Sequence, residues 1–464
     1  MEPSTHTHRC LALSPATRPS QNPHFNHLFA DNHCAIGMAT ETLFDPSSSP
    51  IERLRRVLLS AVIFLVPFLS STLWQGAVLI DEIQESAVPW IHRVVLLFYP
   101  LDLLWFALWV LAIPVAVRIV RTRAFTWAVV ATSVFAAAGI VSWLFNSSAP
   151  GAALGLRWIG LVAIAVVASQ LDRTAFRRFV AIPLVATAAI QSVIVLWQHP
   201  GPAGHAVNGT GEPVAYGSAG NSYVIAFILL LALTTAIAMA PDARSRWWWL
   251  AAAGLCSAGI ATSGSRTAVL GLFIIAFIYV VAAISDRVRY LPAAAVVALP
   301  FLAVAAAIPE TWLPRLQQSL LSSGDITNGR LGMMRDAIAI SFDQPITGVG
   351  PGREALVVEE QFRAHYTTVV WPVHSVPLLA AAELGIAIGV AYVGYLVALA
   401  WRAFKTSPEA FAVLVAVGVW MPLDMLAYLH PTAIIVAAVW AVTLDHLFRL
   451  RRQRQPEEGQ RAVV

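Results

Sequence analysis

Residues 222–240 read SYVIAFILLLALTTAIAMA, and residues 267–285 read TAVLGLFIIAFIYVVAAIS. Neither stretch holds a charged side chain, and each is close to the roughly 20 residues that a helix needs to cross a bilayer. Across all 464 residues, 58% are hydrophobic and 12% are charged, whereas a soluble domain carries roughly 25% charged residues. A soluble fold of this size could not bury so much apolar surface. The composition excludes a cytosolic enzyme, a disulfide-built secreted domain and a disordered chain, and predicts an all-α polytopic membrane protein.

The apolar runs predict about 12 transmembrane helices. They cover residues 57–73, 94–117, 124–144, 155–171, 179–197, 222–240, 247–263, 267–285, 290–308, 374–400, 409–426 and 432–448. With the N-terminus in the cytoplasm, 22 of the 30 Lys and Arg residues fall on the cytoplasmic side. This asymmetry is the one that orients membrane proteins. We therefore expect both termini in the cytoplasm, in the cytoplasmic (inner) membrane of a bacterium.

Eight arginines remain on the outer side, where the charge rule disfavours them. They are Arg93, Arg157, Arg266, Arg315, Arg330, Arg335, Arg353 and Arg363. Five of them fall within residues 309–373, the one long loop that the span pattern leaves. Helix-like pieces at 329–341 and 353–364 flank a Gly-rich turn at 347–352. A long loop in a compact bundle is usually functional.

The same pattern divides the chain into five parts. They are a disordered cytoplasmic tail (1–50), spans 1–9 (51–308), the extracytoplasmic loop (309–373), spans 10–12 (374–448) and a basic cytoplasmic tail (449–464). The basic flank Arg53–Arg56 follows Met38 and suits a start there, so the sequence leaves both Met1 and Met38 open as the first residue. The net charge of +4 is small and gives no reason to expect a nucleic-acid partner.

No Walker A loop, zinc-ligand spacing or Ser-His-Asp signature is present. The stretch Gly348–Gly352 follows no strand, so we interpret it as a rigid turn between two loop helices. The sequence therefore predicts no cofactor and no metal. What remains for chemistry is a set of polar residues at the outer membrane face.

Two of the three main candidates are arginines, Arg266 and Arg330. Arg266 lies in the turn Thr262–Thr267 between two spans, close to the hydrocarbon. A guanidinium there should meet a phosphate, a carboxylate or water, because burying it unpaired is costly. Arg330 and Arg335 are five residues apart, about 140° round a helix, so at most one of them points into a given site.

The third residue is His374, at the start of the tenth predicted span. Imidazole has an unperturbed pKa near 6.5, which suits a general base toward a hydroxyl. Glu383 is nine residues further on, roughly 13 Å along a helix and on its opposite face. We therefore expect Glu383 to be a packing or folding partner and not a partner of His374.

In this order the motifs resemble those of the O-antigen ligase and polymerase superfamily. The motifs are the Thr-Ser-x-Ser-Arg turn at 262–266, the Arg-x-x-x-Met helix at 330–334, the Pro-x-x-Gly-Val-Gly turn at 345–350 and the His-Ser-x-x-Leu-x-x-x-x-Glu-x-Gly segment at 374–385. The resemblance covers residues from about 215 to 400. Met334 stands where an aromatic residue is common, and Ser375 replaces the usual Asn.

The resemblance implies a metal-independent, inverting transfer of a saccharide from undecaprenyl pyrophosphate to a hydroxyl on a glycan, a lipid or a protein. On this basis Arg266 and Arg330 would bind the pyrophosphate and His374 would take the acceptor proton. Arg335, Arg353 and Asn221 are secondary candidates for the same site. Membrane lipids are the other expected partners.

Two other functions compete with this one. Asp81 and Glu82, in the first outer loop, fit a glycosyltransferase that uses a polyprenyl-phosphate sugar. Asp102, Asp424 and His430 lie in or near spans and fit the ion or proton sites of a twelve-span transporter or flippase.

Overall fold

The computed structural model describes part of the chain. The described residues are 49–69, 100–199, 206–207, 213–215, 217–219, 222–242, 246–285, 288–309, 330–362, 372–423, 428 and 431–461. The chain divides into Met1–Arg53 and Leu54–Val464. Of the first unit only residues 49–53 are described, so the predicted N-terminal tail and Met38 lie outside the described residues. The second unit, from Leu54 onward, holds all the other described residues.

The described chain is helical, as predicted, apart from one pair of two-residue strands. Among the described residues, eight helical stretches are long and apolar enough to cross a membrane. They are α5 (Pro100–Thr122), α6 (Trp127–Phe145), α7 (Ala149–Ser169), α8 to α9 (Arg173–Gln198), α10 (Ser222–Met239), α12 (Arg266–Ile284), α18 (Ile386–Thr406) and α21 (Pro431–Arg461). Helix α21 continues past residue 448, where the last predicted span ends.

Four further predicted spans overlap helices that are too short, too weakly hydrophobic or too charged to meet this standard. They are α2 (Pro50–Leu69), α11 (Arg246–Ser263), α13 (Leu291–Ala307) and α19 (Pro408–Gly418). Helix α11 carries Gly, Ser and Thr in its second half, because small residues let it pack closely against α10 and α13. The structure thus supports eight spans, and the count of twelve remains a prediction.

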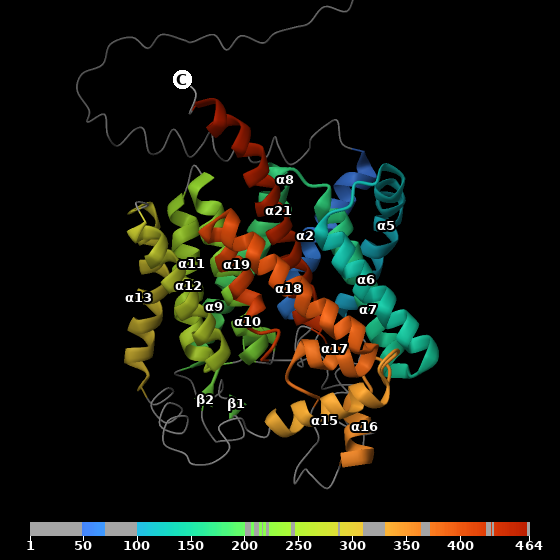
Figure 1. Cartoon of the computed structure of the whole chain (residues 1–464). Helices are drawn as coiled ribbons and strands as arrows, with labels where there is room; N and C mark the ends of the chain where they lie inside the picture. Colours follow the sequence, from blue (N-terminus) through green and yellow to red (C-terminus); the bar gives the residue numbers. More distant parts are fainter. Residues whose placement is uncertain are drawn as a thin grey trace, which may run out of the picture. The chain divides into compact units, whose positions relative to one another are not determined.

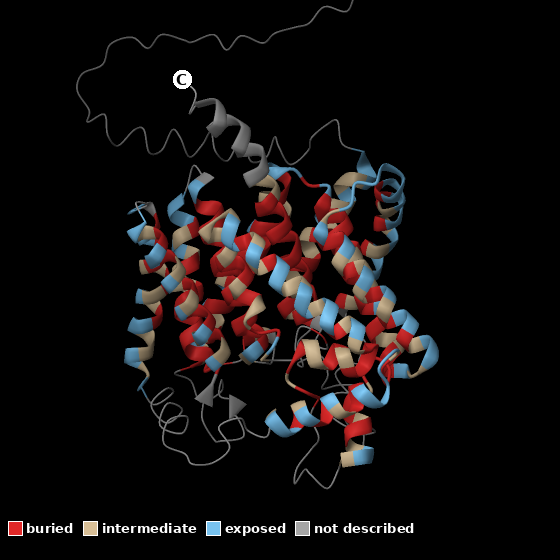
Figure 2. Cartoon of the chain, viewed as in Figure 1, coloured by how far each residue is buried: buried red, intermediate tan, exposed pale blue. Residues whose placement is uncertain are grey.

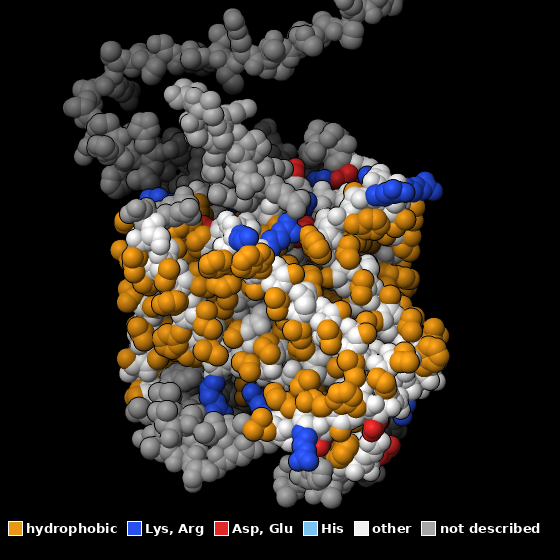
Figure 3. Space-filling model, in the orientation of Figure 1, with side chains coloured by type: hydrophobic (Ala, Val, Ile, Leu, Met, Phe, Trp, Pro, Cys, Tyr) orange, Lys and Arg blue, Asp and Glu red, His pale blue; other side chains and the backbone are white. Residues whose placement is uncertain are grey.

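Helix α10 forms the centre of the unit. From Val224 to Met239 every residue is buried, and the helix packs against α9, α11 and α19. Figure 2 shows this contrast between the centre and the periphery, where helices expose large apolar side chains such as Trp197, Phe277 and Trp401. Figure 3 shows hydrophobic side chains over the flank of these helices and Lys and Arg side chains toward its two ends. This distribution suits helices surrounded by lipid.

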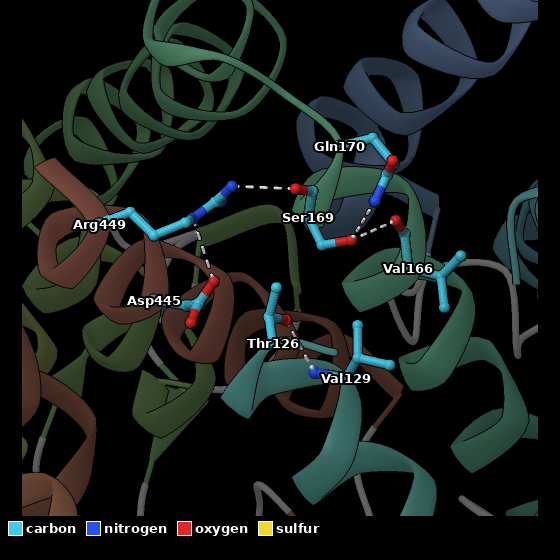
Figure 4. Close-up of polar contacts among 7 residues, drawn as sticks. All are labelled: Thr126, Val129, Val166, Ser169, Gln170, Asp445 and Arg449. Atoms are coloured by element: carbon cyan, nitrogen blue, oxygen red, sulfur yellow. Dashed lines mark hydrogen bonds and ion pairs between the residues drawn. The ribbon is translucent and has the colours of Figure 1, made fainter. Parts of the chain in front are cut away.

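At one end of the bundle, α7 and α21 are joined by a polar junction (Figure 4). The Arg449 guanidinium on α21 donates to the Ser169 backbone oxygen at 2.9 Å and pairs with Asp445 at 3.3 Å. The Ser169 hydroxyl in turn donates to the Val166 carbonyl and accepts from Gln170. We call this group the Arg449 junction.

At the opposite end lie a pair of strands and three short helices (Figure 1). Strand β1 (Ala206–Val207) pairs antiparallel with β2 (Pro213–Val214). Helices α15 (Arg330–Asp343), α16 (Glu354–Phe362) and α17 (Val376–Leu384) come later in the chain. Helices α15 and α16 fall in the two stretches for which the sequence predicts loop helices.

Candidate functional site

The tenth predicted span, 374–400, is wrong as one continuous helix. Gly385 has φ +99° and ends α17, and α18 starts at Ile386. A side chain at Gly385 would place its Cβ against the Ile346 carbonyl, so only glycine allows this approach. The Ile386 amide donates to the Pro345 oxygen at 2.9 Å. The break lets the chain before α16 dock onto the end of α17.

The docked segment is the Gly-rich turn 347–352. The Val349 amide donates to the Ala382 oxygen at 2.9 Å, and the Gly350 amide donates to the Glu383 oxygen at 3.1 Å. Both donors are thereby occupied within the protein. The stretch is a rigid turn between α15 and α16, as the sequence predicts, and those two amides are not available to a phosphate.

Helix α6 holds the turn from the other side. The Ser142 hydroxyl lies 2.6 Å from the Thr347 oxygen and 2.6 Å from the Glu383 oxygen. The Asn146 side-chain amide donates to the Gly348 oxygen at 2.9 Å. The turn is therefore fixed by α6 and α17 together, two helices far apart in sequence.

The Glu383 carboxylate receives the chain that follows the turn. It is 1% exposed and accepts from the Gly352 amide at 2.7 Å and from the Glu354 amide at 3.1 Å. Glu354 opens α16, so the acid lies where the first free amides of that helix need an acceptor. Burial raises the pKa of Glu383 to about 7, although these hydrogen bonds and the nearby Tyr428 hydroxyl oppose the rise. The prediction that Glu383 is a packing partner is confirmed.

His374 lies just before α17 and is half-buried. Burial and, to a smaller extent, the positive charge of Arg330 lower its pKa to about 4, against a hydrogen bond with the Pro372 backbone that raises it. The imidazole is therefore neutral at neutral pH. Its Nδ1 atom is buried and makes no hydrogen bond with any described residue. Arg330, the first residue of α15, thus lies close to a histidine that is ready to accept a proton.

The other predicted arginines lie at different places. Arg335 is exposed while Arg330 is half-buried, so the two do not share a face of α15, as expected from their spacing. Arg353 precedes α16, and its amide donates to the Gly350 oxygen at 3.2 Å. Arg266 opens α12 after the turn that ends α11 and is exposed. That Arg266 and Arg330 face one ligand remains a prediction.

Several predicted residues lie outside the described residues. They are Asn221, Arg93, Arg315, Arg363, Asp81, Glu82, Asp424 and His430. Asp102, proposed for a transporter, is described: Arg157 approaches it to 3.3 Å across α5 and α7. That charge already has a structural partner.

A group of buried acids was missed by the sequence reasoning. Glu354 is 1% exposed and Asp336 is 3% exposed, and Glu354 lies within electrostatic range of both Glu383 and Asp336. Burial raises the pKa of Glu354 well above its usual value, and the charges of Glu383 and Asp336 raise it further. The sequence offers little signal for Glu354, since an acid at the start of a loop helix is ordinary unless the structure buries it. Within the described ranges, no group of three or more His, Cys, Asp or Glu side chains could hold a metal ion.

An apolar cavity of about 260 Å³ lies between α6, α18 and α21. Three of its lining residues, Trp127, Val130 and Val134, are exposed on the flank of α6. Two others, Val376 and Met421, are joined by a hydrogen bond of 2.7 Å two residues beyond His374. The cavity therefore links the apolar flank with the segment that carries His374.

A comparison with known families gives one match. Residues 251–393 match the family model described as O-antigen ligase. The resemblance to the O-antigen ligase superfamily is confirmed. The match indicates an O-antigen ligase-type function in surface polysaccharide biosynthesis, with lipid-linked glycan substrates in a membrane. No curated protein matches the chain.

The O-antigen ligase match includes Arg266, Arg330, the Gly-rich turn and His374. The cavity is only partly covered by it, since α6 and α21 lie outside residues 251–393. The ligase-like segment therefore supplies the proposed chemistry, whereas helices on either side of it in sequence build much of the cavity wall.

Proposed function

We propose that this protein transfers a saccharide from undecaprenyl pyrophosphate to a hydroxyl acceptor at the outer face of the cytoplasmic membrane of a bacterium. It is a metal-independent glycosyltransferase and acts as a ligase or a polymerase in surface polysaccharide synthesis. The observation that carries the proposal is the pairing of a neutral, half-buried His374 with Arg330 in a segment that matches O-antigen ligase.

In the proposed reaction His374 acts as the base, and Arg330 and Arg266 act on the leaving pyrophosphate. The acceptor hydroxyl attacks the anomeric carbon, and its proton passes to His374 as the new glycosidic bond forms. The bond from the anomeric carbon to the phosphate oxygen breaks, and undecaprenyl pyrophosphate leaves with the bonding electrons. Arg330 and Arg266 stabilise the negative charge that develops there, because guanidinium groups bind phosphate oxygens bidentately. Attack opposite the leaving group inverts the anomeric centre.

His374 suits the role of base because it is uncharged before substrate arrives. A histidine with an ordinary pKa would be partly protonated below pH 6.5, whereas burial and Arg330 hold the pKa of this one at about 4. Incoming pyrophosphate brings negative charge, which favours the protonated imidazole formed during transfer. The apolar cavity beside Val376 and Met421 offers room for part of the polyprenyl chain.

Reconstitution tests the proposal. Purified protein in liposomes is given an undecaprenyl-pyrophosphate-linked glycan and acceptors with sugar, lipid or protein hydroxyls, with and without a chelator. We expect transfer by the wild type, unchanged by the chelator, and its loss in His374→Ala, Arg330→Ala and Arg266→Ala. Transfer by all three variants at the wild-type rate would refute the site assignment.

A second set of variants separates the competing mechanism. The double substitution Asp81→Asn with Glu82→Gln should leave transfer intact. Loss of transfer in that variant, with His374→Ala still active, would favour the glycosyltransferase that uses an outer-loop acid. Transport of a lipid-linked glycan without any transfer would favour the flippase.

A further inference from the structure

The Glu354 side chain joins α16 to the segment that carries His374. Its Oε2 atom accepts from the Val373 amide at 3.3 Å. Val373 is fully buried and directly precedes His374. A hydrogen bond to this amide fixes the Pro372–Val373 peptide plane, and the next peptide along the chain joins Val373 to His374.

The far side of the same segment is fixed as well. The Val376 amide donates to the Met421 oxygen at 2.7 Å, and the Ser375 amide donates to the Val373 oxygen at 2.8 Å. His374 therefore sits between two anchored peptides. Val373 is held by a side chain and Val376 by a backbone carbonyl, so only the first anchor can be removed by substitution.

Glu354 is itself held in place. Its own amide donates to Glu383 Oε1 at 3.1 Å, and Glu383 Oε2 accepts from Gly352 at 2.7 Å. A continuous chain of hydrogen bonds thus leads from the end of α17, through the start of α16, to the peptide before His374. Because Glu354 is 1% exposed, water does not compete for these contacts.

The groups around Glu354 favour an uncharged side chain. Glu383 faces it from α17, Asp336 from α15 and the Tyr428 hydroxyl from the segment before α21. Burial and the two neighbouring acids raise the pKa of Glu354 well above its usual value. An uncharged acceptor can still accept from the Val373 amide, so a glutamine should do the same.

We propose that Glu354 is a positioning residue for His374, holding the imidazole beside Arg330 through the Val373 amide. This role rests on the proposed function of His374 as the base that takes the acceptor proton. Glu354 does not touch the reacting atoms and acts only through the backbone.

Three variants test the role. Glu354→Ala removes the acceptor, Glu354→Gln keeps an uncharged acceptor of equal length, and Glu360→Ala removes an exposed acid from the same helix as a control. We expect Glu354→Ala to lower kcat about 10–100-fold, because small displacements of a catalytic group have effects of this size. KM for the donor should stay within about twofold, since no binding contact changes. Glu354→Gln and Glu360→Ala should stay within about twofold of the wild type.

A second readout does not depend on transfer. Diethyl pyrocarbonate modifies neutral imidazole, and mass spectrometry reports the rate at the peptide containing His374. We expect Glu354→Ala to be modified several-fold faster, whereas Glu354→Gln and Glu360→Ala keep the wild-type rate. If Glu354→Ala does not fold, Glu354→Asp replaces it, because the shorter side chain retains the acid and loses its reach to Val373.

The outcomes separate the two proposals. An unchanged rate of His374 modification in Glu354→Ala, or in Glu354→Asp where it replaces that variant, would overturn the positioning role, whatever the activity. A loss in Glu354→Gln equal to that in Glu354→Ala would also overturn it, since charge would then be what matters. If wild-type protein transfers nothing while the modification rates change as expected, the proposed function fails and the structural link from Glu354 to His374 stands.

Discussion

The two ends of the helix bundle differ in how their buried polar groups are paired. At the Arg449 junction a cation meets an anion, Asp445, and a backbone carbonyl of α7 (Figure 4). At the other end, Glu354 and Glu383 lie near each other, and His374 lies near a positive charge. Opposite charges stabilise a fold, whereas like charges and a desolvated base weaken it. Such strain is typical of sites that do chemistry.

The largest effect should come from the base itself. His374→Ala should lower kcat for transfer about 10²–10⁴-fold, the usual contribution of a positioned general base. Arg449→Ala, at the opposite end, should leave the rate per folded molecule unchanged. The measurement is product formed from a lipid-linked donor in liposomes. If both variants lost the same fraction of the transfer rate, the end that carries His374 would matter no more for transfer than the end that carries Arg449.

A smaller effect should come from the neighbouring cation. Arg330→Ala should lower kcat/KM about 10–100-fold, because a charge-assisted contact to phosphate is lost. Arg335→Ala, an exposed arginine on the same helix, is the matched control and should stay within about twofold. In Arg330→Ala the acidic limb of the pH–rate profile should also shift to higher pH, because the charge that lowers the pKa of His374 is gone. An unmoved limb would contradict the pairing of Arg330 with His374.

The pH dependence of the wild type sharpens the comparison further. The acidic limb of kcat/KM should lie near pH 4 and not near 6.5, since it reports the base in the free enzyme. Stability should change as well. The lowered pKa of His374 means that the unfolded chain binds the proton more readily, so stability is lost as pH falls from 6.5 to 4.

Glu383 should change the stability with pH in the opposite direction to His374. Its pKa is raised to about 7, so its contribution to stability is present below pH 4.5 and is lost as pH rises through 7. Thermal unfolding in detergent from pH 4 to 8, compared for wild type, His374→Gln and Glu383→Gln, separates the two groups. A wild-type curve unaltered by either substitution would contradict both assignments.

The smallest effect on activity should come from the Arg449 junction. Arg449→Ala removes a hydrogen bond and an ion pair, so it should lower the free energy of unfolding by about 1–3 kcal/mol. Denaturation monitored by Trp fluorescence measures this loss. A large fall in transfer per folded molecule would show that the junction is coupled to the site.

Part of the candidate site stands out in the sequence because its signals are local. Arg266, Arg330 and His374 stand out as charged or titratable residues in an apolar chain, where each one has few alternative explanations. The spacing of Arg330 and Arg335 correctly separated a half-buried arginine from an exposed one. Glu354 gave no comparable signal, since an acid at the start of a loop helix is ordinary unless the structure buries it.

The sequence by itself determined the helical fold, the membrane environment and the resemblance to O-antigen ligase, because hydropathy and short motifs depend on residues near one another in the chain. Only the tertiary structure decided that Gly385 divides the tenth predicted span, that Ser142 and Glu383 hold one turn in place and that the charge of Arg330 reaches His374. These contacts join residues up to 241 positions apart, as between Ser142 and Glu383. Burial and charge at such contacts depend on what the folded helices bring together, and no local pattern encodes that.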